Sequence, residues 1–249
     1  MKIIAIYNIK GGVGKTASAV NLSYLASRDG ARTLIWDLDP QGAASYYFRI
    51  KAKVKGGGQK LVEGHNELDA AIKGTDYENL DLLPADFSYR NMDLILDNVK
   101  KPTKRLNRLL EPLAEEYDFI FLDCPPSISS ASESVFAAAD MLLIPTIPTT
   151  LSLRTYKQIL KFFKQQKYDA MKILPFFAMV DRRKQLHRLI VDNPPSFIPV
   201  KLASSIPYAS EIERMGVNRA PVGDFAANSR AAQCYKSMWE ELKALMFEA

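Results

Sequence analysis

A glycine-rich segment close to the start of the chain constrains the possible folds more than any other feature. Residues 8–16 read NIKGGVGKT; they follow an apolar run over residues 3–7 and lead into a helical pattern that begins at Lys15. Glycines allow the main chain to approach a phosphate group closely, and N–H groups at the start of a helix point toward such an anion. A loop that ends in Gly-Lys-Thr between a strand and a helix therefore predicts a phosphate-binding loop in an α/β fold.

Side chains from three segments are expected to complete this site. Lys15 should contact the β- and γ-phosphates of a nucleotide, and the Thr16 hydroxyl should bind Mg²⁺. Asp123 ends a second apolar run, which is the usual position of the carboxylate that holds Mg²⁺ through water. Asp37 and Asp39 follow another predicted strand, so at least one of them should reach the same crevice at the strand ends.

The loop departs from the standard phosphate-loop pattern at one position. In G-x-x-x-x-G-K-[ST] the first residue is glycine, whereas Ile9 stands there in this chain. A second lysine, Lys10, comes directly before the pair Gly11-Gly12. The loop therefore carries two lysines.

Hydrophobic periodicity predicts alternating strands and helices along almost the whole chain. The predicted strands cover residues 3–7, 33–36, 79–83, 118–122, 141–144, 172–180 and 200–206, and the predicted helices cover 15–28, 90–99, 103–116, 129–139, 152–166, 184–192 and 228–247. This alternation predicts a single α/β domain over residues 1–249, with a doubly wound, mostly parallel sheet and helices on both faces. Residues 49–60 carry four lysines and three consecutive glycines, and we interpret them as a solvated surface loop or, alternatively, a mobile arm that contacts phosphate.

Composition narrows the class of protein further. The chain of 249 residues is 47% apolar and 24% charged, as is typical of globular proteins. No apolar run approaches the ~18 residues of a membrane-spanning helix, and we expect a cytoplasmic location. The only cysteines, Cys124 and Cys234, lie far apart, and the only histidines, His65 and His187, argue against a histidine zinc site. His187 is expected on an exposed helix face. A net charge of +5 permits an anionic partner.

Three segments together resemble one known family. Residues 10–16 (KGGVGKT) resemble the deviant Walker A loop of the ParA/MinD family of dimerising ATPases, residues 37–42 (DLDPQG) its second motif, and residues 121–127 (FLDCPPS) its Walker B motif. The DPQG and DCPPS sequences resemble those of the ParA branch. The chain differs from the family at Ala43, where asparagine is common, and after Pro145, where glutamine is common; residues 207–221 match only loosely.

The resemblance implies ATP and Mg²⁺ as cofactors and assigns roles to particular residues. It implies nucleotide contacts from Lys10, Gly11, Gly12, Val13, Gly14, Lys15, Thr16 and Ala17, catalytic roles for Lys10, Lys15 and Asp39, and metal binding by Thr16, Asp39 and Asp123. In the family, ATP is sandwiched between two subunits, so Lys10 would reach the phosphates of the partner subunit. Asp39 would orient the attacking water, and Asp37 would support it.

The same resemblance implies DNA as a partner. ParA-like ATP dimers bind nonspecific double-stranded DNA and release it after hydrolysis, which a ParB-like or other adaptor stimulates. They position plasmids, chromosome origins or protein cargos over the nucleoid. The basic residues implied for DNA contact are Arg182, Arg183, Lys184, Arg188, Arg214, Arg219 and Arg230; Lys100, Lys101, Lys104, Arg105 and Arg108 form a second basic cluster. Because the phosphate loop starts near residue 10, we expect no separate N-terminal DNA-binding domain.

Three other functions are weighed against this one. A MinD-like ATPase would bind a membrane surface through its last helix, but the polar face of residues 235–249 carries more glutamate than lysine, so we expect that helix to pack in the core and no membrane partner. A reductase like the nitrogenase iron protein would need two cluster cysteines at a dimer face, which Cys124 and Cys234 do not fit. A P-loop metabolic enzyme remains an alternative, because it would use the same phosphate loop and differ from a ParA-like ATPase in having a pocket for an acceptor substrate.

Overall fold

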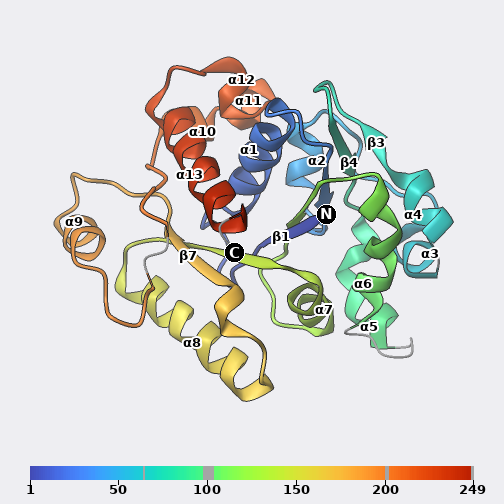
Figure 1. The fold of residues 1–249 in the computed structure, drawn as a ribbon, viewed down its shortest axis with the longest axis horizontal. Helices are drawn as coiled ribbons and strands as arrows, with labels where there is room; N and C mark the ends of the chain where they lie inside the picture. The colour runs from blue at the N-terminus through green and yellow to red at the C-terminus, as the bar shows by residue number, and fades with distance from the viewer. Residues whose placement is uncertain (64, 98–103, 200–201, 248–249) are drawn as a thin grey trace.

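The computed structural model describes residues 1–63, 65–97, 104–199 and 202–247, which form the α/β domain drawn in Figure 1. Its strands are β1 (Lys2–Ile6), β2 (Thr33–Asp37), β3 (Lys73–Gly74), β4 (Leu80–Leu83), β5 (Phe119–Asp123), β6 (Met141–Thr146) and β7 (Ile173–Phe177). Its longer helices are α1 (Lys15–Arg28), α7 (Ser130–Ala138), α8 (Thr150–Gln166), α9 (Gln185–Asp192) and α13 (Arg230–Phe247). The shorter helices are α2 (Ala43–Tyr47), α3 (Gly57–Glu63), α4 (His65–Ala71), α5 (Met92–Asp97), α6 (Arg105–Leu110), α10 (Ser210–Glu213), α11 (Met215–Asn218) and α12 (Val222–Phe225), and single 3₁₀ turns cover Phe87–Asn91, Glu111–Glu115 and Ala170–Lys172.

The described strands form one sheet in the order β3-β4-β2-β5-β1-β6-β7. All neighbouring pairs are parallel except β3 with β4. Register aligns Ile6 of β1 with Asp123 of β5, and Asp123 with Asp37 of β2. The phosphate loop after β1 and the two carboxylates therefore start from the same edge of the sheet. This confirms the predicted doubly wound, mostly parallel fold.

Helices cover both faces of the sheet, as Figure 1 shows. Alternate residues of each strand point to opposite faces. In β1, Ile3 and Ala5 join the cluster formed with the helices between α3 and α9, whereas Ile4 and Ile6 join the cluster formed with α1, α2 and the segment from α10 to α13. The inner strands are mostly apolar because both of their faces are buried.

The last helix packs in the core, as predicted. The Trp239 ring lies edge-on to Phe119 of β5 at a centroid distance of 5.2 Å, and its indole N–H donates to Asp29 at 2.8 Å. Lys243 also binds Asp29, at 2.6 Å. The apolar face of α13 is thereby buried against the sheet and α1. Nowhere in the described ranges is a helix both long and apolar enough to cross a membrane.

The prediction of a solvated loop over residues 49–60 is wrong for residues 57–60, because α3 begins at Gly57. The glycines serve close packing there: a Cβ at Gly57 would lie 2.7 Å from the Ser88 hydroxyl oxygen, and one at Gly58 would lie 3.1 Å from the Tyr89 ring. The N–H of Gly58 donates to the Ser88 hydroxyl at 2.8 Å. Val54, which precedes them, is buried. Glycine here indicates contact between segments rather than freedom of the chain.

Two predicted strands are also corrected. The strand predicted over 172–180 ends at Phe177, and Met179 adopts a left-handed conformation with φ of 53°. The strand predicted over 200–206 does not form in its described part, since the N–H groups of Ala203 and Ser204 donate to the Glu241 carboxylate of α13 instead. An isolated β-bridge joins Pro207, the residue after this segment, to Val180. Residues 200 and 201 lie outside the described ranges.

His187 lies in the core, contrary to the expectation of an exposed position. It is 4% exposed, and its Nδ1 accepts a hydrogen bond from the Asp181 N–H at 3.1 Å. Burial lowers the pKa of His187, which favours the neutral ring that this acceptor role needs. The helical period places His187 on the face of α9 that also buries Ile190.

Candidate functional site

The phosphate loop is held in shape by its first residue, which the sequence analysis did not single out. Asn8 is fully buried; its amide donates to the Pro145 carbonyl of β6 at 2.9 Å, and its side-chain oxygen accepts from the Lys10 N–H at 2.9 Å. Gly12 and Gly14 have φ of 68° and 92°, a region that residues with a Cβ rarely adopt. The loop thus depends on one asparagine and two glycines for its course.

The space above the loop is open to a ligand. A Cβ added at Gly11, Gly12 or Gly14 would meet no protein atom within 4 Å. Gly14 caps α1 without a side-chain hydrogen bond, so the N–H groups of the first turn of this helix of 14 residues stay available. Such a helix start attracts anions through its N–H groups and its dipole.

Lys15 is the buried cation of the loop. It is 6% exposed, and its ammonium donates to the Lys10 carbonyl at 3.2 Å. Burial lowers the pKa of Lys15, and the neighbouring Asp123 carboxylate opposes that effect. A desolvated ammonium at a helix start is placed to gain a bound anion as its partner.

Carboxylates lie beneath the loop. Both side-chain oxygens of Asp123 and one of Asp37 are buried and have no hydrogen-bond partner of ordinary geometry among the described residues. Burial raises the pKa of Asp123, and the charge of Asp37 raises it further, while the nearby Thr16 hydroxyl and Lys15 ammonium lower it. Oxygen atoms of carboxylates and a hydroxyl are the donors that Mg²⁺ prefers, so the side chains of Thr16 and Asp123 fit this ion.

The other oxygen of Asp37 fixes the segment that carries Asp39. It accepts from the Ser45 N–H at 2.8 Å and from the Ser45 hydroxyl at 2.7 Å, and the Ser45 oxygen accepts from the Ala85 N–H at 3.0 Å. These bonds join the ends of β2 and β4 to α2 in a fully buried network. Asp37 thus contacts the protein itself, consistent with the supporting role expected for it.

We expect Ser45→Ala to lower the free energy of unfolding by about 2 kcal/mol, because the buried Asp37 carboxylate loses one of its two hydrogen bonds and the buried Ala85 N–H loses its acceptor. Urea unfolding of the purified chain measures this. Ser210→Ala, on the exposed face of α10, serves as the control and should change the value by less than about 0.5 kcal/mol. Equal stability of the two variants would contradict the network's role.

A cleft of about 380 Å³ opens over the loop. The loop and α1 line one side of it with Gly11, Gly12, Gly14, Lys15, Thr16, Ala17 and Ser18, and Asp39 and Tyr47 lie beside them. The opposite wall contains Met179, Pro207 and Tyr208. Met179 follows the early end of β7, and the other two follow the segment in which the predicted strand does not form. This wall was not predicted from the sequence.

Not every predicted nucleotide residue lines the cleft. Val13 is fully buried, so only its main chain can face a ligand. Lys10 is half-buried, and its side chain is absent from the cleft wall within the described part of the chain. Asp123 lies behind Lys15 and Thr16, fully buried. Asp39 does line the cleft; one of its oxygens accepts from the Gln41 N–H at 3.0 Å.

Four of the seven basic residues predicted for DNA contact share one groove of about 970 Å³. Arg182, Arg183, Arg188 and Arg230 line it, at the start of α9 and of α13. Arg182 pairs with Asp192 at 2.7 Å, and Arg183 pairs with Asp181 at 2.9 Å, which lowers the pKa of Asp181 to about 2. Lys184 precedes α9 and is exposed but does not line the groove.

The remaining basic residues lie elsewhere. Arg219 stacks over the Tyr46 ring at 4.6 Å, and Arg214 lies 6.0 Å from the Phe225 ring. In the second basic cluster, Arg105 donates to the Val62 carbonyl at the end of α3, so it has a structural role. Lys100 and Lys101 lie outside the described residues. The fold therefore divides the predicted DNA surface into one groove and two isolated arginines.

Comparison with known proteins agrees with this architecture. Residues 1–175 match a family model described as an AAA domain. The chain is 31% identical over 249 residues to the sporulation initiation inhibitor protein Soj of Bacillus subtilis, covering 98% of each chain. It is 27% identical over 248 residues to the chromosome-partitioning ATPase Soj of Treponema pallidum, covering 98% of this chain and 97% of that one. A solved structure of cobyrinic acid a,c-diamide synthase from Mycobacterium smegmatis, with a bound ATP analogue and magnesium, has a TM-score of 0.81 at 25% identity, covering 98% and 95% of the two chains.

Proposed function

The chain belongs to the ParA branch of the ParA/MinD family of P-loop ATPases, and from this premise we propose that it hydrolyses ATP as a Mg²⁺-dependent dimer that binds nonspecific DNA and positions a cargo. One observation carries the proposal: the uncapped start of α1 and the buried Lys15 lie directly above Asp123, whose carboxylate oxygens have no hydrogen-bond partner of ordinary geometry among the described residues. The proposed dimer acts with an adaptor that stimulates hydrolysis, in the cytoplasm and over the nucleoid.

Each residue of the cleft has a task in this proposal. The N–H groups of residues 11–17 and the Lys15 ammonium bind the phosphates, since they lie at the start of a helix. Thr16 and Asp123 hold Mg²⁺, which neutralises charge on the phosphate oxygens when bound. Asp39 keeps one carboxylate oxygen free of protein donors within the described residues, so it can accept a proton or a hydrogen bond from the attacking water.

Lys10 is proposed to act on the partner subunit. Its main chain is fixed by Asn8 and Lys15, while its side chain leaves the cleft of its own subunit. A cation that reaches a transferring phosphoryl group stabilises the charge that develops there, as an arginine finger does. Dimerisation would therefore complete the catalytic site.

The groove lined by Arg182, Arg183, Arg188 and Arg230 is the proposed DNA surface. Arg188 and Arg230 have no carboxylate partner among the described residues, so their charges are available to phosphate groups. The test is binding to a nonspecific duplex at several salt concentrations, with no nucleotide, with ADP and with ATP–Mg²⁺. Binding that requires ATP and weakens with salt supports the proposal; an ATP dimer that ignores DNA overturns it.

The double variant Arg188→Ala/Arg230→Ala should weaken DNA binding and reduce the salt slope of log K by about 2, because each phosphate contact contributes about 0.9. Fluorescence anisotropy with a labelled duplex in ATP–Mg²⁺ measures this slope. Arg219→Ala is the matched control, since Arg219 stacks on Tyr46 outside the groove. A double variant with the slope of the unmodified chain would remove the groove from the proposal.

A metabolic ligase is a second candidate, because the similar Mycobacterium smegmatis structure bears the name of a synthase. Such an enzyme needs an acceptor beside the phosphate loop. The two functions differ in what raises the ATPase rate: DNA with an adaptor in one, a small acid and an ammonia donor in the other. Measuring ATP hydrolysis with each addition separates them.

A further inference from the structure

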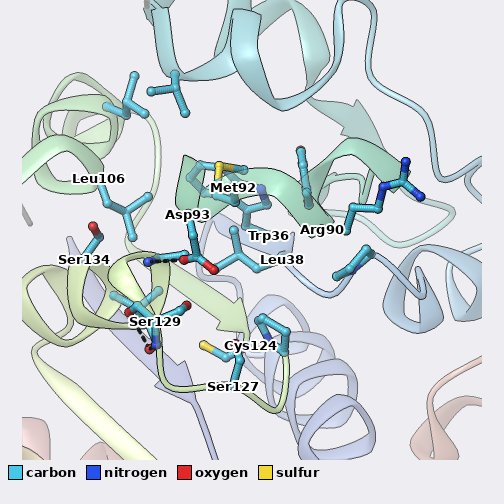
Figure 2. A pocket seen from close by; sticks show the side chains of 18 residues that line it. Trp36, Leu38, Arg90, Met92, Asp93, Leu106, Cys124, Ser127, Ser129 and Ser134 are labelled. Carbon is cyan, nitrogen blue, oxygen red and sulfur yellow. Dashed lines mark hydrogen bonds between the residues drawn. The ribbon is translucent and has the colours of Figure 1, made fainter. Parts of the chain in front are cut away.

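A second cavity, of about 270 Å³, lies between the sheet and the helices α5, α6 and α7 (Figure 2). Its wall is mostly apolar and is formed by Trp36, Val62, Tyr89, Met92, Leu106 and Leu109, each of them buried. Concave, mostly apolar pockets with a few polar groups are the usual binding sites of small molecules. A pocket with this lining is therefore a candidate site for such a molecule.

One end of the cavity is polar. The Asp93 carboxylate of α5 accepts from the Ala131 N–H of α7 at 2.9 Å with one oxygen, and its second oxygen has no partner among the described residues. Figure 2 shows this carboxylate reaching toward Leu38 and Ser129, while the Arg90 guanidinium turns away. The Arg90 charge instead lies 4.2 Å from the centre of the Phe87 ring. Arg90 and Asp93 both line the cavity, but the Arg90 charge is engaged with the Phe87 ring, so the carboxylate of Asp93 is the charge that a ligand would meet.

We propose that this cavity binds a small aromatic molecule that carries a protonated amine. An apolar cavity of about 150 Å³ can hold benzene, so the larger space here accommodates a ring with a short chain. The ring would pack against the apolar wall that includes Trp36 and Leu106, and the ammonium would donate to the free oxygen of Asp93. A carboxylate ligand would meet Asp93 with like charge and should be rejected.

The position of the cavity connects it with the nucleotide cleft. Leu38 and Pro40, which flank Asp39, line it, and so do Cys124 and Pro125, which follow Asp123. A molecule in the cavity contacts both segments on the side away from the phosphate loop. Binding there is therefore coupled to binding of ATP–Mg²⁺, and this part of the inference rests on the proposed function. Thermodynamic linkage requires the coupling to be equal in both directions.

The first experiment uses the full chain without nucleotide and three probes of similar size: 2-phenylethylamine, 2-phenylethanol and 3-phenylpropionate. Calorimetric titration should rank the amine about tenfold above the alcohol, because only the amine pairs a positive charge with the Asp93 carboxylate, with the acid weakest. Tryptophan fluorescence of the unmodified chain should change when a probe binds. In Trp36→Phe it should not change, because the remaining Trp239 belongs to the cluster on the other face of the sheet. No binding of the amine at about 1 mM overturns the site, and equal binding of amine and alcohol overturns the amine class.

Variants test the role of Asp93. Asp93→Asn keeps an acceptor for the Ala131 N–H but removes the charge, so it should lose about tenfold in affinity for the amine and less than twofold for the alcohol. The exposed Glu111→Gln is the control and should change neither. Leu106→Trp fills the cavity and should abolish binding of both probes; urea unfolding checks that it folds. Affinity of Asp93→Asn for the amine equal to that of the unmodified chain would overturn the assignment.

The second experiment tests the coupling. ATP–Mg²⁺ should change the dissociation constant of the amine by at least about twofold, and the amine should change that of ATP by the same factor. An amine affinity that is unaffected by ATP–Mg²⁺ overturns the coupling. If the amine binds but the chain does not hydrolyse ATP, the cavity site stands and the proposed function fails; if ATP is hydrolysed but no probe binds, the reverse holds.

Discussion

Lys15→Ala is expected to weaken ATP binding by roughly 100-fold or more, with little change in stability. The Lys15 ammonium is buried beside the start of α1, where charge-assisted hydrogen bonds to phosphate are worth about 1.5–3 kcal/mol each. Two such bonds account for a factor of roughly 100 or more. Calorimetric titration with a nonhydrolysable ATP analogue and Mg²⁺ measures the loss.

The fold should survive this substitution because, among the described residues, the Lys15 ammonium donates one hydrogen bond, to the Lys10 carbonyl at 3.2 Å. Burial of its charge costs more than the attraction of Asp123 returns, as the lowered pKa of Lys15 indicates, so its removal should not destabilise the chain. Lys161→Ala, on the exposed surface of α8, is the matched control and should bind ATP normally. Unchanged affinity in Lys15→Ala would contradict the assignment of the loop.

The central part of the fold could be predicted from the sequence because local pattern and long-range structure agree there. The helix predicted over 15–28 has those bounds in the structure, and its start is set by the loop that binds phosphate. Asp37 and Asp123 end buried strands, and parallel register brings them level without any further information. A phosphate site at this edge therefore follows from periodicity and strand order alone.

The errors occur where a residue has a partner distant in the sequence. Gly57 and Gly58 read as flexible loop residues, yet they pack against Ser88 and Tyr89, some 30 positions away. In the segment predicted as a strand over 200–206, the N–H groups of Ala203 and Ser204 donate to Glu241, which lies on α13. Hydrophobic periodicity is read over a few neighbouring residues, which include neither partner, so it cannot identify these contacts.

The wall of the nucleotide cleft opposite the phosphate loop was missed for a related reason. Met179 lies in a predicted strand, but its left-handed backbone ends that strand and turns the chain toward the cleft. A residue with a Cβ adopts this conformation only where the surrounding structure imposes it. Asn8 was missed because its role depends on the Pro145 carbonyl of another strand, although its position directly after β1 could have indicated it.

Asp39→Ala is expected to bind ATP and dimerise but to hydrolyse ATP about 100-fold to 10,000-fold more slowly, the range for loss of a general base. Asp39 lines the cleft beside Lys15 and Thr16 but contributes no bond to the phosphate loop among the described residues. Its removal should therefore leave the ground state of bound ATP intact while taking away the carboxylate that orients water. Phosphate release in single-turnover reactions measures hydrolysis, and size-exclusion chromatography with ATP–Mg²⁺ measures the dimer.

A loss of ATP binding in this variant would assign Asp39 to holding the nucleotide rather than to hydrolysis. Asp76→Ala is the matched control, because Asp76 is an exposed carboxylate that pairs only with Arg49 at the surface. Full turnover by Asp39→Ala would instead leave Asp123 and Asp37, which are fully buried, and Glu213, which lines the cleft. Asp123 and Asp37 cannot reach a water in the cleft without a change in the strands that carry them, so the water would then have to be positioned by Glu213 or by the partner subunit.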